Sequence, residues 1–121
     1  MAFECFQRWN SCNKANGDCQ DGDATREGKF YFNGPDAAGV FSGTYTPRGS
    51  ATPEAVVGRC AEGSPQLTVV RIGRDGRVHL YFGDGDGATH VRGKHKTVVG
   101  LERNGELIIR DDDDWMGTHT T

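Results

Sequence analysis

Hydrophobic residues follow two different periods along this chain, and the period changes near Lys29. Within residues 2–13, large side chains recur at three-residue spacing: Phe3, Phe6, Trp9 and Cys12. That spacing keeps side chains close to one face of a helix. We therefore expect an N-terminal helix within residues 1–16, ended by Gly17 as a C-terminal cap.

After Lys29 the period becomes that of β-strands, so we expect residues 29–121 to form a sheet of repeated strand–turn–strand units. The segments KFYFN and GVFSGTYT, aromatic and β-branched between glycines, predict the first two strands. TPEAVVGRCAEG has two interpretations. Thr52 as N-cap and Pro53 at the first helical position favour a short central helix, whereas the valine pair and Gly58 favour a strand.

Two later segments predict hairpins with three-residue turns. The turns are RDG at 74–76, within QLTVVRIGRDGRVHLYF, and RNG at 103–105, within TVVGLERNGELIIRD. We expect the glycine at the third loop position to have a positive φ in each turn. This register places Ile72 opposite Val78 and Leu101 opposite Leu107.

The same register separates an apolar face from a polar one in the first hairpin. We expect the core side to hold the residues Val70, Ile72, Val78, Leu80 and Phe82, with Val99, Leu101, Leu107 and Ile109 from the second hairpin. The opposite face carries Val69, Arg71, Arg77, His79 and Tyr81. A slip of one residue would exchange the faces, so their clean separation supports the register.

An internal repeat supplies the candidate binding residues. FYFNGPDAAGVFSGTYT aligns without a gap on LYFGDGDGATHVRGKHK fifty residues later, and DWMGTHT repeats the last part of the unit. In the three copies a polar ring stands two residues after a glycine: Tyr45, His95 and His119. The strand period places Tyr45, His95 and His119 on the same face as Phe41, Val91 and Trp115, respectively. We expect the three rings, with Phe41 and Trp115, to line a pocket for a small-molecule ligand.

Carboxylates suggest a weaker alternative. Asp84 and Asp86 in GDGDGA resemble the start of a calcium loop, but the third acidic ligand and the late glutamate of an EF-hand are missing. We therefore predict an ordinary hairpin loop, with no resident metal and no cofactor. The run RDDDD at 110–114 predicts a solvated turn before the last strand.

Composition and charge bound the remaining possibilities. A chain of 121 residues suits one domain, and a net charge of −3 gives no general attraction to nucleic acid. A basic stripe, residues His90, Arg92, Lys94 and Lys96, is expected on one strand face, and we read it as an ordinary solvated surface. The apolar runs are too short to span a bilayer, and the N-terminus does not resemble a signal peptide. We therefore expect a cytoplasmic protein.

The expected redox state of the cysteines depends on the expected cytoplasmic location. Cys5, Cys12 and Cys19 are separated by six residues each, which does not match the short gaps of zinc sites. Disulfides fit the even number of four, but a cytoplasmic chain favours free thiols. We expect no disulfide between Cys60 and the N-terminal cysteines.

One local resemblance points to a known family. GVFSGTYTPRGSAT resembles the third-strand segment of avidins, and DDW, ending at Trp115, is similar to a segment near their C-terminus. The resemblance covers under a fifth of the chain. It implies an eight-stranded antiparallel barrel that binds biotin, with Tyr45 at a biotin-contacting position. The chain departs from the family at Pro47, where avidins have Thr or Ser, and has few tryptophans to wall a pocket. We do not assign the family.

From these patterns we expect an α+β protein: a curled antiparallel sheet, or barrel-like shell, of about seven strands covered by an N-terminal helix and a short central helix. Sheets of this size must close, pair or cover their edges, so a homodimer is expected. The expected function is non-enzymatic binding of a small molecule on the concave sheet face. The alternative is a protein-interaction module acting through a sheet edge or dimer surface. A small enzyme or a weak nucleic-acid binder ranks third.

Overall fold

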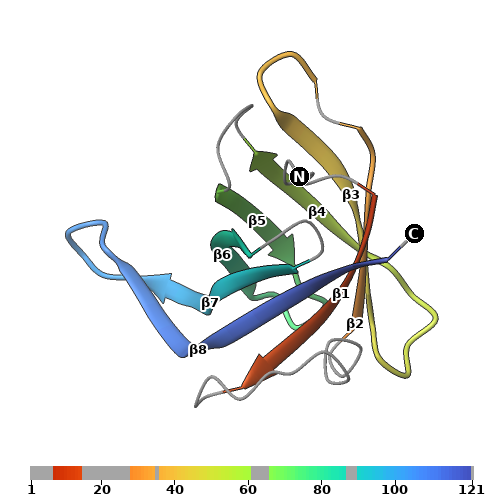
Figure 1. Cartoon of the computed structure of the whole chain (residues 1–121). Coiled ribbons are helices and arrows are strands. Elements are labelled where there is room, and N and C mark those ends of the chain that lie inside the picture. The colour runs from red at the N-terminus through yellow and green to blue at the C-terminus, as the bar shows by residue number, and fades with distance from the viewer. Residues whose placement is uncertain (1–6, 15–27, 35, 61–65, 87–89, 121) are drawn as a thin grey trace.

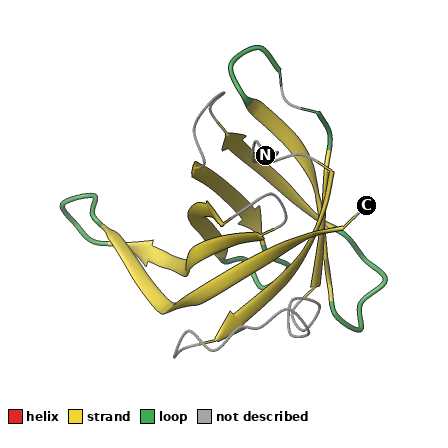
Figure 2. Cartoon of the chain, viewed as in Figure 1, coloured by secondary structure: helices red, strands yellow, loops and turns green. Residues whose placement is uncertain are grey.

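The chain is all-β wherever its structure is described. The computed structural model describes residues 7–14, 28–34, 36–60, 66–86 and 90–120. Strands and turns account for all of them, as Figure 2 shows, and none forms a helix that could cross a membrane. The eight strands are β1 (Gln7–Lys14), β2 (Gly28–Phe32), β3 (Val40–Pro47), β4 (Glu54–Cys60), β5 (Gln66–Ile72), β6 (Val78–Asp86), β7 (His90–Leu101) and β8 (Leu107–Thr120).

The strands follow one another around a closed barrel (Figure 1). Every strand pairs antiparallel with the next one in sequence, and β1 pairs with both β2 and β8. Trp9, for example, stands opposite Phe30 on one side and His119 on the other. Closure removes most of the free strand edges on which a homodimer was expected. Within the described residues, positions 107–113 of β8 are not paired with β1.

Alternation of side chains fills the interior with aromatic rings. In β2 and β4 every second residue is buried. The main buried cluster is Phe30, Phe32, Phe41, Tyr45, Val56, Cys60, Leu67, Val69, Tyr81, Val91 and Trp115. Phe30 lies at its centre, with its ring centroid 4.6 Å from that of Tyr45 and 5.1 Å from that of Tyr81.

The expected α+β class is wrong, as is the expectation of about seven strands. In place of an N-terminal helix, the described part of that segment is strand β1. A helix of a dozen residues is marginal by itself, whereas β1 gains backbone ladders with two neighbouring strands. Residues 1–6 and the proposed cap at Gly17 lie outside the described residues.

The expected central helix is also wrong, because its segment forms β4. Glu54, Val56, Gly58 and Cys60 are buried in alternation with exposed neighbours, which is the strand period. A Cβ at Gly58 would overlap the ring of Phe41 on the adjacent strand. The valine pair and Gly58 were therefore the decisive residues of this segment, and the capping residues were not.

Both hairpin turns have the predicted conformation. Gly76 and Gly105 have φ values of 81° and 88°. Ile72 stands opposite Val78, and Leu101 stands opposite Leu107. In each turn the glycine N–H donates to a carbonyl three residues earlier, Gly73 in the first turn and Glu102 in the second.

The buried side of these hairpins is nevertheless the opposite of the expected one. Val69 and Tyr81 are fully buried, whereas Ile72 and Leu101 are 53% and 66% exposed. The hairpin alone fixes which residues share a face, and closure of the barrel fixes which face points inward. Turning Tyr81 inward lets its large ring join the aromatic core.

The aspartate run does not form the expected turn before the last strand. β8 extends unbroken from Leu107 to Thr120 and includes all four aspartates. Two of them have basic partners on β7: Asp114 accepts a bond from Lys94 at 2.6 Å, and Asp113 lies 2.8 Å from a ring nitrogen of His95. The Lys94–Asp114 ion pair and the Asp113–His95 hydrogen bond connect this acidic segment to β7.

Candidate functional site

Polar side chains gather inside one end of the barrel, below the turn between β5 and β6. We call them the turn-end cluster: Glu54, Arg71, His79, His95, Thr97 and Asp113. They come from five consecutive strands, β4 to β8. Glu54, Arg71 and His79 lie close to strand ends, whereas His95, Thr97 and Asp113 lie near the middle of the longer strands β7 and β8. Pairing of neighbouring strands brings them together, since His79 stands opposite both Arg71 and Thr97, and His95 stands opposite Asp113.

Arg71 is the central charge of the cluster. Its Nη1 atom donates to Glu54 Oε1 at 2.9 Å, and the backbone N–H of Arg74 donates to the other carboxylate oxygen, also at 2.9 Å. The guanidinium carbon lies 4.2 Å from the centre of the Tyr45 ring. Both charged side chains are largely buried. The pair is therefore well satisfied, and the ring below adds a cation–π contact.

One donor of Arg71 is left over. Its Nε atom is buried and has no hydrogen-bond partner. A buried guanidinium N–H without an acceptor is costly, and such groups often mark a place for a water or a ligand.

Two histidines and an aspartate form a chain beside Arg71. Asp113 Oδ1 lies 2.8 Å from His95 Nδ1, and His95 Nε2 lies 3.0 Å from His79 Nδ1. The Asp113 carboxylate can only accept, so Nδ1 of His95 carries a proton. In the tautomer with its proton on Nδ1, His95 accepts at Nε2, and His79 donates from Nδ1.

The environment of His79 keeps it uncharged. Burial, followed by the positive charge of Arg71 and by His95, lowers the pKa of His79 from 6.5 to about 4. At neutral pH the turn-end cluster therefore holds one arginine, two carboxylates and a neutral His79. A second positive charge beside Arg71 would be repelled in this poorly solvated place.

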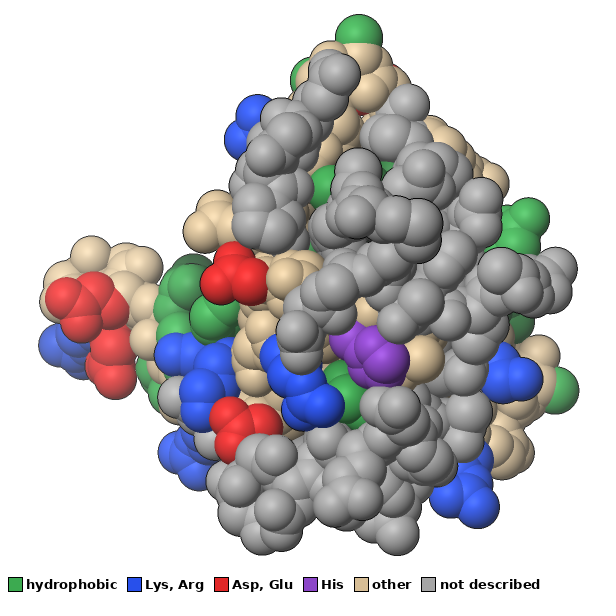
Figure 3. All heavy atoms as spheres, viewed as in Figure 1, with side chains coloured by type: hydrophobic (Ala, Val, Ile, Leu, Met, Phe, Trp, Pro, Cys, Tyr) green, Lys and Arg blue, Asp and Glu red, His purple; other side chains and the backbone are tan. Residues whose placement is uncertain are grey.

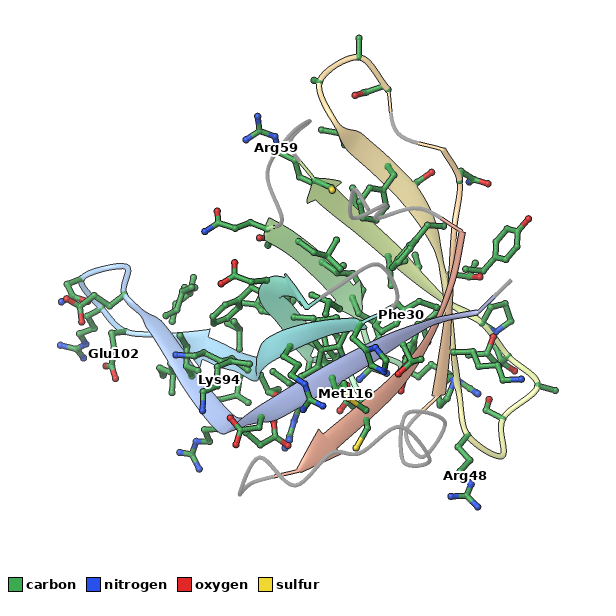
Figure 4. All side chains as sticks on the ribbon, viewed as in Figure 1. Phe30, Arg48, Arg59, Lys94, Glu102 and Met116 are labelled. Carbon is green, nitrogen blue, oxygen red and sulfur yellow. The ribbon has the colours of Figure 1, made fainter. Side chains whose placement is uncertain are left out.

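Aromatic rings lie directly below these polar groups. Tyr81 links them to the core: its ring centroid lies 4.8 Å from that of His95 and 5.3 Å from that of Trp115. Tyr45 lies under Arg71 and 4.6 Å from Phe30, which Figure 4 labels inside the barrel. The site thus combines a polar upper layer with an aromatic floor, as small-molecule sites usually do.

The structure brings together three of the five residues expected to line a pocket. Tyr45, His95 and Trp115 are buried and are linked through contacts with Tyr81. Phe41 is buried too, but it packs on Phe32, with ring centroids 4.6 Å apart. His119 lies on β8, and its side chain is outside the described ones.

The repeat that suggested these residues is not a structural equivalence along its whole length. Tyr31 and Tyr81 correspond in the alignment, yet Tyr31 is 49% exposed and Tyr81 is 1% exposed. Both copies do form antiparallel hairpins, β2–β3 and β6–β7. The face is preserved in the second strand of each copy, where Phe41 and Val91, and likewise Tyr45 and His95, are buried.

The weak metal candidates are not brought into a cluster. Asp84 is exposed on β6 opposite Arg92, and the side chain of Asp86 is outside the described ones. Among the residues that the structure describes, no three His, Cys, Asp or Glu side chains are placed to hold a metal ion.

Three central members of the turn-end cluster were missed by sequence reasoning. Arg71 and His79 alternate with apolar residues, so the pattern assigned them to solvent. Glu54 follows Thr52 and Pro53 in the segment for which a short helix was one of two interpretations. The available signal was Tyr81, a large ring on the same strand face as His79, which would have identified that face as the buried one.

The cysteine prediction is also wrong. Cys12 and Cys60 are both disulfide-bonded, and the described part of the chain holds no free thiol. Cys12 is fully buried and clusters with Met116, whereas Cys60 belongs to the main core. Disulfides are typical of oxidising compartments, so this finding opposes the cytoplasmic expectation.

Comparisons with known proteins provide no relative. No family model matches the chain, no curated protein matches it, and no solved structure matches it. The short resemblance to avidins therefore does not establish membership of that family.

Proposed function

We propose that this protein is a non-enzymatic small-molecule-binding domain whose ligand binds at the turn-end cluster. The observation that carries the proposal is the Nε atom of Arg71, a buried donor without a partner above an aromatic floor. Tyr45, His95 and Trp115 belong to the same site, which keeps three of the residues expected from the sequence.

The donors in the site define the ligand chemistry. Arg71 offers an N–H, and His79 and His95 already use each other and Asp113. A ligand with a carboxylate or carbonyl oxygen would satisfy Arg71, and an aromatic or alicyclic body would pack on Tyr45 and Tyr81. Charge favours the carboxylate, because it would face a guanidinium in a poorly solvated place.

Binding fits the cluster better than catalysis does. Thr97 is the hydroxyl closest to the histidines, with Oγ1 at 3.4 Å from His79 Nδ1. The ring nitrogen facing this hydroxyl, His79 Nδ1, is the one that donates to His95, so it cannot act as a base that activates Thr97. The Asp113–His95–His79 chain then serves to hold ring orientations.

The test follows the side-chain Nε–Hε resonance of Arg71 by ¹⁵N NMR. Three probes that share a phenyl ring and differ in the charge of its substituent are added: benzoate, benzamide and benzylamine. We expect benzoate to shift the Arg71 resonance in a saturable way, benzamide to do so more weakly, and benzylamine to leave it unchanged. Arg71→Lys keeps a cation for Glu54 but lacks Nε, so benzoate should no longer shift the ring resonances of Tyr45 and Trp115 that it shifts in the wild type. Arg48→Lys, an exposed control, should keep these shifts. An Arg71 resonance unmoved by all three probes would reject the site.

The disulfides support a location different from the one expected. We propose that the chain matures in an oxidising compartment, because Cys12 and Cys60 are both bonded. Protein purified from a reducing cytoplasm should contain free thiols and melt at a lower temperature than protein made in an oxidising compartment. Equal thiol content and melting temperature in the two preparations would reject this.

A further inference from the structure

The outside of the barrel carries an apolar surface where an alternating sheet would normally be polar. Its central row crosses four strands in register: Ile72, Val78, Val98 and Ile109. A second row lies beside it and consists of Val57, Val70 and Leu80. We call these two rows, with the Leu101–Leu107 pair, the outer apolar face.

Large side chains of this face are open to solvent. Ile72, Leu101 and Leu107 are each more than half exposed, and Val57 and Ile109 are only slightly less so. Scattered exposed apolar residues are normal, but contiguous rows of them mark a contact surface. Val57, Val70, Leu80, Val78 and Val98 lie between two paired strands, so their row is a true sheet face. Ile109 and the Leu101–Leu107 pair are paired on one side only, within the β7–β8 hairpin.

The β7–β8 hairpin extends this surface beyond the barrel. Figure 1 shows the hairpin projecting away from the other strands. Register shifts interrupt the β7–β8 ladder between Val98 and Gly100, and such bulges bend a strand pair. The Leu101–Leu107 pair therefore stands on an arm that no other described part of the chain covers.

Charges at the two ends of the face are of opposite sign. The turn at the end of the arm carries Glu102 and Glu106 with one arginine, Arg103. The other end of β7 carries the predicted basic stripe at its outward positions, including Arg92, Lys94 and Lys96. Figure 3 shows the same order: a charged tip, green apolar side chains, then blue basic ones, and Figure 4 labels Glu102 and Lys94 at the two ends.

This order of charges favours a second copy of the chain as the partner that covers the outer apolar face. A twofold axis through the Val98–Ile109 pair would lay the face of one copy on that of another in reverse direction. The acidic tip of each arm would then meet the basic stripe of the other copy. A twofold interface requires such a self-complementary surface.

The size of the face is also of the right order. From Val57 on β4 to Ile109 on β8 there are four strand spacings, or roughly 19 Å, and from Lys94 to Glu102 there are eight residues, or roughly 26 Å. The projected area is thus roughly 500 Å², and a standard interface buries about 800 Å² of accessible surface on each partner.

We infer that two copies of this chain form a homodimer by packing their outer apolar faces together, with the arms reaching across the twofold axis. This interface lies on the outside of the barrel and is independent of the turn-end cluster. It replaces the strand-edge contact that barrel closure removes.

Sedimentation velocity of the whole chain tests the inference. We expect a dimer at micromolar concentration, and Ile109→Lys should raise its dissociation constant at least 100-fold. Val40→Lys is the matched control, because Val40 is a similarly exposed valine on β3, away from the face. It should leave the dimer intact. A monomeric wild type overturns the proposal, as does an equal effect of the two variants.

Charge exchange and NMR remove the remaining ambiguity. Glu102→Lys with Glu106→Lys should weaken the dimer, and adding Lys96→Glu should restore part of the affinity. Lys94 is left unchanged because it pairs with Asp114 in the same chain. If Ile109→Lys fails to fold, the interface is tested by NMR on a mixture of two wild-type samples that carry different isotope labels. Intermolecular contacts between Val98 and Ile109 methyl groups are expected, and their absence overturns the interface. Binding of monomeric protein to phosphatidylcholine vesicles through this face would identify a lipid surface instead and would also overturn it.

Discussion

Gly93 shows how one residue permits the close approach of two strands. It stands opposite Gly83 on the neighbouring strand, and a Cβ at position 93 would overlap the carbonyl oxygen of Phe82. The obstacle is backbone, which cannot rotate away as a side chain would. Tyr81 and His95 stand on the same two strands, so the spacing at this glycine pair affects how the candidate site is held.

We predict that Gly93→Ala destabilises the protein by more than about 2 kcal/mol, because β6 and β7 must separate to admit the methyl group. Gly34→Ala is the control, since a Cβ there meets nothing within 4 Å. It should change stability by less than about 0.5 kcal/mol. Chemical denaturation measures both, and equal effects would contradict the crowding seen at Gly93.

His79 provides a pH prediction. Its pKa in the folded protein is about 4, against 6.5 as the ordinary value, so the unfolded chain binds the proton more readily. Its contribution to stability is therefore complete above pH 6.5 and is lost as the pH falls toward 4. At about 1.4 kcal/mol per pH unit, the loss reaches roughly 3 kcal/mol.

The substitution His79→Asn keeps a side-chain donor but cannot be protonated. We expect the difference in unfolding free energy between wild type and variant to shrink as the pH falls from 6.5 to 4. Urea denaturation at half-unit pH intervals measures it. Parallel curves for the two proteins would show that His79 is not buried as a neutral ring.

At the scale of elements, an ion pair between two neighbouring strands stabilises one end of the barrel. Glu54 opens β4 and Arg71 stands near the end of β5, and their ion pair joins the two strands inside the barrel. Glu54 also accepts from the backbone of Arg74, so the same carboxylate fixes the β5–β6 turn. Loss of this carboxylate would therefore disturb both the pair and the turn.

We predict that Glu54→Leu and Arg71→Met each cost about 3–5 kcal/mol, because each leaves a buried charge without its partner. The double variant should cost clearly less than the sum, since no charge is then left alone. A double-mutant cycle by urea denaturation gives the coupling energy. Additive effects would mean that water screens the pair.

At the scale of the whole molecule, disulfides supplement a small core. A domain of this size buries limited apolar surface, and extracellular domains commonly add such bonds. Cys12 belongs to a buried pair with Met116, while Cys60 lies in the main cluster, so bonded cysteines occur in both.

We expect reduction to destabilise the folded protein by about 2–4 kcal/mol. Intact mass before reduction should be lower by one hydrogen for each bonded cysteine. Differential scanning calorimetry with and without reductant should show a clear fall in melting temperature. An unreduced mass equal to that of the fully reduced chain would contradict the bonded state of Cys12 and Cys60.

The sequence by itself determined the local features. Turn chemistry fixed the left-handed glycines Gly76 and Gly105, and with them the register of two hairpins, because a turn involves only a few neighbouring residues. Part of the candidate site followed in the same way, since the period of a strand placed Tyr45 on one face with Phe41.

Only the tertiary structure decided which face is inside, and that the two segments expected to be helices are strands where they are described. Residues 7–14 became a strand because two partners distant in sequence were available to pair with them. Arg71 and His79 point inward because the barrel closes around Tyr81, and the apolar side with Ile72 is left for another surface to cover. These outcomes depend on pairings between distant strands, and the local order of hydrophobic residues does not encode them.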